Sequence, residues 1–140
     1  MPRMLLFTVG HGHYGLELEA LQEVADDPLR HYVPGTGNVL AGAVNVHGRI
    51  LPVIDLPLLL GAADAVRDQR LVVLGPQFHG LALVVSAVGR IVPFEAENLE
   101  LPVGDEGGGL VAGVVEVDSL RINLLDPGAV VERLETIYAV

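Results

Sequence analysis

The sequence predicts an all-β protein made of two small five-stranded β-barrels packed together, with short connecting helices and a C-terminal helix. Two observations lead to this prediction: a long internal repeat, and many short apolar runs separated by turn residues. Residues 42–57 align without a gap on residues 113–128. The two copies are separated by about half the chain, which indicates two similar folding units, because a solenoid needs several shorter repeats.

A second, shorter pair of segments supports the duplication. Residues 14–18 (YGLEL) align with residues 79–83 (HGLAL), at a similar separation along the chain. In both halves a glycine opens an apolar strand, a two-residue turn follows, and a second apolar strand returns. An aspartate ends that strand in each half, Asp55 in the first and Asp126 in the second. The repeated unit is therefore a β-hairpin followed by an acidic residue.

The N-terminal part of the chain has the pattern of strands. Residues 4–18 are expected to form a hairpin, because the apolar run is interrupted by a Gly-His-Gly turn and then resumes with alternation. Residues 19–24 are expected to form either a short helix or a turn before another strand. Leu18, Leu21 and Val24 would share one face of such a helix.

The first copy of the repeat follows a loop. Residues 34–38 are rich in Pro and Gly and predict that loop. The first repeated hairpin is expected over residues 40–54, with its turn at residues 47–48. Asp55 is then expected to cap a single helical turn that ends at Gly61, because Asp is a good N-cap and Gly a good stop signal.

The second half opens with three further strands. They are expected at residues 70–74, where β-branched residues are frequent, and at residues 80–85 and 87–93. Residues 93–109 combine Pro, Gly and five acidic residues. This composition predicts a long, mobile acidic loop.

The second copy of the repeat precedes the C-terminal helix. The hairpin is expected over residues 110–125, with its turn at residues 118–119. Asp126 as N-cap and Pro127 as the first helical residue then predict a helix that ends near Tyr138.

The strand pattern favours closed barrels over one open sheet. Roughly ten short strands occur in two matching sets, and closure into barrels removes exposed strand edges. We expect a single domain whose barrels comprise approximately residues 15–65 and 66–125, with the N-terminal strand crossing over. The C-terminal helix is expected over residues 126–138.

Composition excludes several classes of function. The 140 residues are 51% hydrophobic and carry a net charge of −10, from 18 acidic and 8 basic residues, all of them arginine. The electrostatic field of this negative charge repels the phosphate backbone of nucleic acids, so nucleic-acid binding is not expected. No apolar run approaches the ~20 residues that a membrane span needs. The absence of cysteine removes disulfides and thiol chemistry, and together these points favour the cytoplasm.

Several segments resemble the CheW family, the coupling proteins of bacterial chemotaxis. Residues 40–56 (LAGAVNVHGRILPVIDL) are similar to the family signature, in which a glycine and apolar residues precede Asn-Leu-Arg-Gly and then apolar-Pro-Val-apolar-Asp-Leu. Residues 7–15 resemble the family's opening hairpin. Residues 21–24 resemble its Val-Gln-Glu-Ile segment, and residues 81–88 resemble its Gly-apolar-Val-Val-Asp-x-Val strand.

The resemblance has consequences for both fold and function. It implies two intertwined five-stranded barrels of the Src-homology-3-like kind. It also implies a non-enzymatic cytoplasmic adaptor, without a cofactor, that bridges the cytoplasmic tips of methyl-accepting chemoreceptors to the histidine kinase CheA, whose regulatory domain is homologous. The residues expected to face these partners are Leu21, Glu23, Gly42, Asn45 and His47.

The chain departs from the family pattern at three places. His47 stands where the signature has arginine, so a permanently charged fork of donors is replaced by a group that titrates near neutrality. Ser86 replaces the usual aspartate after Val-Val, and residues 37–39 replace Pro-Pro-aromatic. We expect the first departure to affect partner contact and the other two to affect local packing.

Other sites are suggested by single motifs. His11-Gly12-His13, with His31, His47 and His79, has the spacing of a metal site, but the ordinary interpretation is solvated turn residues. Ser86 and Ser119 lie in no nucleophile motif, and Gly107-Gly108-Gly109 lacks the Lys-Ser/Thr of a phosphate-binding loop. A small histidine-based metal enzyme therefore stays only a remote alternative.

The partner-facing residues also have structural interpretations. Asn45 is expected either as a buried amide bonded to loop backbone or as a direct partner contact. Glu23 is either a solvated acid or a receptor contact, and His47 is either a turn residue tolerant of positive φ or part of the interface. A diverged scaffold of another motility or two-component pathway is the second functional hypothesis, suggested by His47.

Overall fold

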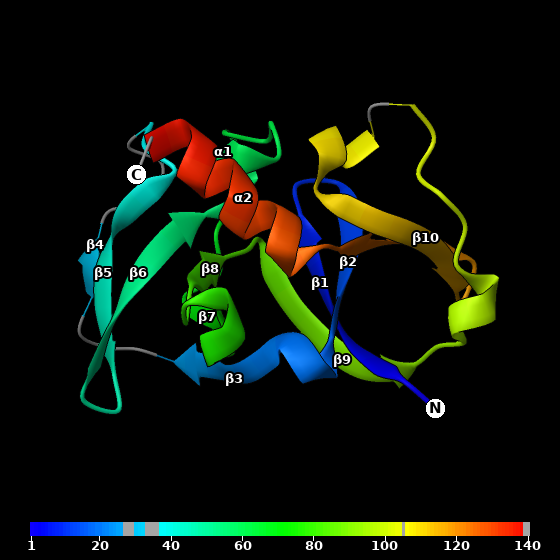
Figure 1. Ribbon diagram of the computed structural model, residues 1–140, viewed down its shortest axis with the longest axis horizontal. Helices are drawn as coiled ribbons and strands as arrows, with labels where there is room; N and C mark the ends of the chain where they lie inside the picture. Colours follow the sequence, from blue (N-terminus) through cyan, green and yellow to red (C-terminus); the bar gives the residue numbers. More distant parts are fainter. Residues whose placement is uncertain (27–29, 33–36, 105, 139–140) are drawn as a thin grey trace.

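The computed structural model describes residues 1–26, 30–32, 37–104 and 106–138. Within this part of the chain eleven β-strands form two sheets (Figure 1). One sheet, called barrel 1, has the order β3-β7-β8-β6-β5-β4, and the other, called barrel 2, has the order β10-β11-β2-β1-β9. The strands of barrel 1 are β3 (Leu21–Asp26), β4 (Arg30–Tyr32), β5 (Leu40–Val46), β6 (Arg49–Asp55), β7 (Arg70–Leu74) and β8 (Ala82–Val84). Those of barrel 2 are β1 (Arg3–Val9), β2 (Gly12–Glu17), β9 (Ala87–Pro93), β10 (Val111–Val117) and β11 (Leu120–Leu125).

The expected division into residues 15–65 and 66–125 is wrong. The chain begins in barrel 2 with β1 and β2, passes into barrel 1 for β3 to β8, and returns to barrel 2 at β9. In the sequence, the strands of barrel 1 thus lie between the first two and the last three strands of barrel 2. The parallel pairs β6–β8 and β2–β11 join strands far apart in the sequence, and the apolar pattern of a strand does not specify which distant strand it pairs with.

The two edges of each sheet are formed by different parts of the chain. In barrel 1, β3 pairs with β7 while β4, the next strand in the chain, pairs with β5 at the opposite edge of the sheet. Without the three-residue β4, the other five strands of this sheet, β3-β7-β8-β6-β5, match the five strands of barrel 2 in the order β9-β1-β2-β11-β10. In barrel 2, the chain after β9 returns to β10 through the antiparallel bridge Glu100–Val114. The predicted all-β fold of two small barrels is confirmed.

The internal repeat is confirmed in the strand register. Every Cα pair of the β5–β6 hairpin has an equivalent pair in the β10–β11 hairpin under the gapless alignment of the two copies. The register shifts at equivalent places, between Leu40 and Gly42 and between Val111 and Gly113. The first turn residues, His47 and Asp118, both have positive φ, 52° and 50°, as a two-residue hairpin turn requires.

The shorter repeat needs a correction of its alignment. Val53 pairs with Ala82 in barrel 1, and the equivalent Leu124 pairs with Gly15 in barrel 2. The equivalent of Gly15 is therefore Ala82 and not Gly80. Strands alternate with a period of two, so a shift from Gly80 to Ala82 leaves the apolar pattern unchanged and cannot be detected from it.

Residues 18–26 resolve the choice left open by the sequence. A short 3-10 turn, η1 (Leu18–Ala20), leads directly into β3. Leu18, Leu21 and Val24 therefore do not share a helical face. The long segment 93–109 holds two further 3-10 turns, η3 (Ala96–Asn98) and η4 (Glu106–Gly109). Of the predicted loop at residues 34–38, residues 34–36 lie outside the described part of the chain.

The two aspartates that end the repeated hairpins differ in role. Asp126 caps the C-terminal helix α2 (Pro127–Tyr138), as predicted, because its Oδ1 accepts the Ala129 N–H at 3.1 Å. Asp55 precedes α1 (Leu56–Leu59) but makes no side-chain cap bond, so that prediction is wrong. Its fully buried carboxylate instead pairs with Arg67 at 3.1 Å, because a buried charge needs a charged partner.

Three apolar cores hold the molecule together. One fills barrel 1, one fills barrel 2, and the largest lies between the barrels and takes residues from both, including Phe7, Leu16, Ile54, Leu83 and Val130. Helix α2 leaves barrel 2 and runs across to barrel 1 (Figure 1), where the phenol oxygen of Tyr138 accepts the Leu40 N–H at 2.7 Å. None of the helices described is long and apolar enough to cross a membrane.

Candidate partner-binding site

The tip of the β5–β6 hairpin brings together three of the five predicted partner-facing residues. His47 occupies the turn, Asn45 lies two residues before it, and Glu23 comes from β3, an edge strand of the same sheet. The Nε2 atom of His47 lies 3.0 Å from Oε1 of Glu23. The His47 side chain is 77% exposed and that of Glu23 32%, so both can be reached from solvent while they contact each other.

Asn45 shapes the turn. Its Oδ1 accepts the N–H of Gly48 at 2.9 Å, and His47 and Gly48 adopt φ values of 52° and 82°. The expected bond to loop backbone is present, but Asn45 is exposed and not buried. The side-chain amide of Asn45 thus holds the turn that presents His47, and it does so at the surface of the hairpin.

The other two predicted residues lie elsewhere. Leu21 opens β3, pairs with Leu74 and packs against the core between the barrels. A register shift between Leu21 and Glu23 separates this half-buried leucine from the partly exposed acid. Gly42 lies at the bulge of β5 with φ of 144°, a conformation that favours glycine. It is five residues from His47, roughly 16 Å along the strand.

A shallow cavity of about 260 Å³ lies beside the tip. It is bounded by β3 and the end of β5, and its lining includes the acids Glu23 and Asp26 and the base His47. Ile50, the cross-strand partner of Asn45, is 67% exposed on the same hairpin. An exposed apolar residue beside hydrogen-bonding groups suits protein–protein contact. Within the described residues the cavity holds no nucleophile next to a positioned base.

Barrel 2 has a counterpart of the Glu23–His47 pair. Asp118 is equivalent to His47 in the internal repeat, and its carboxylate accepts a hydrogen bond from the Arg90 guanidinium. Arg90 lies on β9, which occupies the position in barrel 2 that β3 occupies in barrel 1. In each barrel a polar side-chain contact therefore joins an edge strand to a hairpin tip, and the acidic residue lies on the edge strand in barrel 1 and at the tip in barrel 2.

The histidines do not gather into a metal centre in the described part of the chain. No group of three or more His, Asp or Glu side chains there is placed to hold a metal ion. His47 and His79 occupy separate turns with positive φ. His31 lies on β4, and its side chain lies outside the described residues.

Sequence reasoning did not find the contacts of two polar residues, Arg67 in the connection after β6 and Ser86 between β8 and β9. Arg67 pairs with Asp55, and the Ser86 hydroxyl accepts the N–H of Gly10 at 2.9 Å. Arg67 lies in a stretch without periodic pattern, so no local signal marks it. Ser86 could be singled out from the sequence, because it replaces the aspartate of the family signature and was expected to affect local packing.

Comparison with known proteins identifies the family that this chain resembles. The family model described as CheW-like domain matches residues 3–135, which include both barrels. The chain is 27% identical over 97 residues to the chemotaxis protein CheW of Klebsiella aerogenes, an alignment that covers 68% of this chain and 58% of that protein. It is 23% identical over 133 residues to the chemotaxis protein CheW of Thermotoga maritima, covering 94% of this chain and 88% of that protein.

A solved structure agrees with the family match. The crystal structure of the scaffolding protein TtCheW from Thermoanaerobacter tengcongensis superposes with a TM-score of 0.76 and 26% sequence identity. The superposition covers 89% of this chain and 84% of that one. The resemblance seen in the residue motifs is thus confirmed over nearly the whole chain, and the chain belongs to the family of CheW-like domains.

Proposed function

We propose that this protein is a cytoplasmic, non-enzymatic adaptor that couples methyl-accepting chemoreceptors to a CheA-type histidine kinase in chemotaxis. The observation that supports this most directly is the match to the CheW-like domain over residues 3–135. A relative of the same fold is described as a scaffolding protein. Coupling of this kind is geometric: one surface of a rigid molecule binds the receptor tip and another binds the regulatory domain of the kinase.

The tip of barrel 1 is the partner-binding surface in this proposal. Glu23, Asn45 and His47 supply hydrogen-bonding groups that fix the register of the partner, and the exposed side chain of Ile50 supplies apolar contact. Leu21 and Gly42 support the surface indirectly. Leu21 anchors β3 to the core, and Gly42 permits the bulge that curves β5.

Calorimetric titration with the regulatory domain of the cognate kinase, and separately with the receptor tip, tests the proposal. We expect saturable binding to each, with no change in the covalent structure of either partner. Absence of binding to the kinase domain at concentrations up to roughly millimolar, equivalent to about −4 kcal/mol, would refute the coupling function.

The second candidate is a diverged scaffold of another motility or two-component pathway. His47 favours this candidate, because it stands where the family signature has arginine. Titration against kinase regulatory domains from several pathways of the same organism distinguishes the two. Preferential binding to a kinase outside chemotaxis would favour the diverged scaffold.

A further inference from the structure

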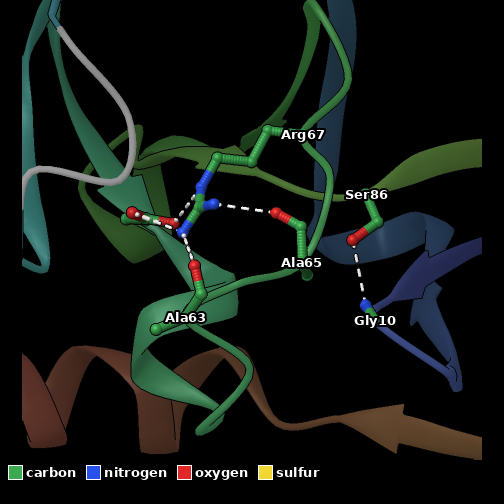
Figure 2. Close-up of polar contacts among 6 residues, drawn as sticks. Gly10, Ala63, Ala65, Arg67 and Ser86 are labelled. Atoms are coloured by element: carbon green, nitrogen blue, oxygen red, sulfur yellow. Dashed lines mark hydrogen bonds and ion pairs between the residues drawn. The ribbon is translucent and has the colours of Figure 1, made fainter.

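Arg67 organises the connection that follows barrel 1's repeated hairpin. Its guanidinium makes two hydrogen bonds of 3.1 Å to the buried carboxylate of Asp55, and it donates to the carbonyl oxygens of Ala65 at 2.8 Å and Ala63 at 3.0 Å (Figure 2). The side chain is only 14% exposed. One cation thus neutralises the buried Asp55 and fixes the shape of the loop around it.

This loop contacts barrel 2. A Cβ atom added at Gly10, in the β1–β2 turn, would lie 3.3 Å from the Cβ of Ala62 and 3.8 Å from that of Ala65. The loop therefore lies against the Gly10 backbone at van der Waals distance. Gly10 has φ of 59°, so glycine serves here both for conformation and for close approach.

Ser86 holds the other side of the same turn. It lies in the crossover from β8 of barrel 1 to β9 of barrel 2, and its Oγ accepts the Gly10 N–H at 2.9 Å (Figure 2). The Ser86 N–H donates to the Thr8 carbonyl at 2.8 Å. The β1–β2 turn of barrel 2 is thus bound between the Arg67 loop and the crossover, both of which are anchored in barrel 1.

We infer that Arg67 and Ser86 form a brace that fixes the orientation of the two barrels relative to each other. The apolar core between the barrels favours their association, but the hydrophobic effect is not directional. Hydrogen bonds depend on angle as well as on distance. The two bonds of Ser86 reach β1 and the β1–β2 turn of barrel 2 directly. Those of Arg67 stay within its own loop and act by fixing the shape that this loop presents to Gly10. For coupling, which rests on the proposed adaptor function, Arg67 and Ser86 are positioning residues that hold barrel 2 at a constant angle to the partner-binding tip of barrel 1.

The distance between the two hairpin tips tests the brace. The chain has no cysteine, so single cysteines at Ile50 in barrel 1 and Ser119 in barrel 2, both exposed, can carry spin labels for pulsed electron resonance. Arg67→Ala would remove the cation that pairs with the buried Asp55 carboxylate and is expected to destabilise the fold strongly. Arg67→Lys is therefore used, because it keeps the charge but lacks the planar guanidinium that binds two acceptors at once. Ser86→Ala removes only the hydroxyl, and Arg3→Lys at an exposed site is the control.

We expect a narrow distance distribution in the labelled parent and in Arg3→Lys, and a broader or shifted one in both Arg67→Lys and Ser86→Ala, with circular dichroism unchanged. A distribution in either junction variant that superposes on that of the parent overturns the brace. This measurement needs no partner, so it is independent of the coupling function. Failure of the unmodified protein to bind the kinase domain would refute the function and leave the brace intact.

Discussion

Asp55 and Asp126 occupy equivalent positions in the two copies of the repeat but bind different groups. Each follows the second strand of its hairpin, and each backbone N–H donates to an equivalent carbonyl, that of Val39 at 2.7 Å and that of Leu110 at 2.8 Å. The carboxylate of Asp126 caps α2, whereas that of Asp55 is buried against Arg67. Duplication preserved the backbone contact while the side chains acquired separate roles.

This difference predicts unequal losses of stability. Asp55→Ala leaves Arg67 without its carboxylate in a largely buried place and is expected to lower the free energy of unfolding by about 3–5 kcal/mol. Asp126→Ala removes one cap bond and is expected to cost about 1 kcal/mol. Urea denaturation measures both, with the exposed Asp64→Ala as a control that changes stability by less than about 0.5 kcal/mol. Equal losses at Asp55 and Asp126 would contradict the role assigned to the buried pair.

Charge reversal at Glu23 tests the proposed partner surface. Glu23→Arg places a cation beside His47 and removes the carboxylate from the tip, so we expect affinity for the receptor tip to fall by roughly tenfold or more, about 1.4 kcal/mol. The melting temperature should change little, because the side chain is partly exposed and lies outside the cores. Glu95→Arg, at an exposed site away from the tip, should leave affinity unchanged. If the Glu23 variant melts many degrees lower, Glu23 is structural.

His47→Arg tests the position at which the chain departs from the family signature. Arginine offers a bidentate pair of donors to a carboxylate, so His47→Arg should bind more tightly to a partner that presents a carboxylate here. His79→Arg, at another exposed histidine with positive φ, is the matched control. Calorimetric titration of both variants with the kinase domain and with the receptor tip measures the change. Weaker binding by His47→Arg would indicate a partner adapted to the histidine ring, and an affinity equal to that of the parent would show that His47 serves only the turn.

Asp68 predicts a specific acid sensitivity of the fold. Burial raises the pKa of its carboxyl group, but hydrogen bonds from the Arg70 side chain and from the N–H groups of Arg70 and Val88 outweigh burial and lower the pKa below its usual value. A lowered folded-state pKa stabilises the fold above the unfolded value, and that contribution disappears as the pH falls through the folded value.

Asp68→Asn should therefore be less stable than the parent at pH 7, and the difference should shrink below about pH 4. Thermal unfolding between pH 7 and pH 2.5 measures this, with Asp64→Asn as the control. A stability difference that stays constant over this range would show that Asp68 contributes through its shape and not through its charge.

Local structure could be predicted from the residue pattern alone. Alternating apolar residues with a period of two predicted the strands, and His47-Gly48 and Asp118-Ser119 predicted both repeated turns, because these residue types accept positive φ. Asp126 and Pro127 likewise predicted the start of α2. These features depend on residues that are neighbours in the chain, so their physical causes can be read from it directly. The motifs around residues 40–56 were specific enough to indicate the family.

Contacts between distant residues depended instead on how the chain packs. Where the chain passes from one barrel to the other depends on which strand edges pair as the chain packs. Many strands have a similar apolar pattern and could pair with each edge, so the pattern does not specify the pairing. The partner of Asp55 could not be found from the sequence, because Arg67 lies in an aperiodic stretch and becomes necessary only once the carboxylate is buried. The contact between Glu23 and His47 arises for the same reason: the curvature of barrel 1 brings the edge strand β3 to the tip of a hairpin 24 residues away in the chain.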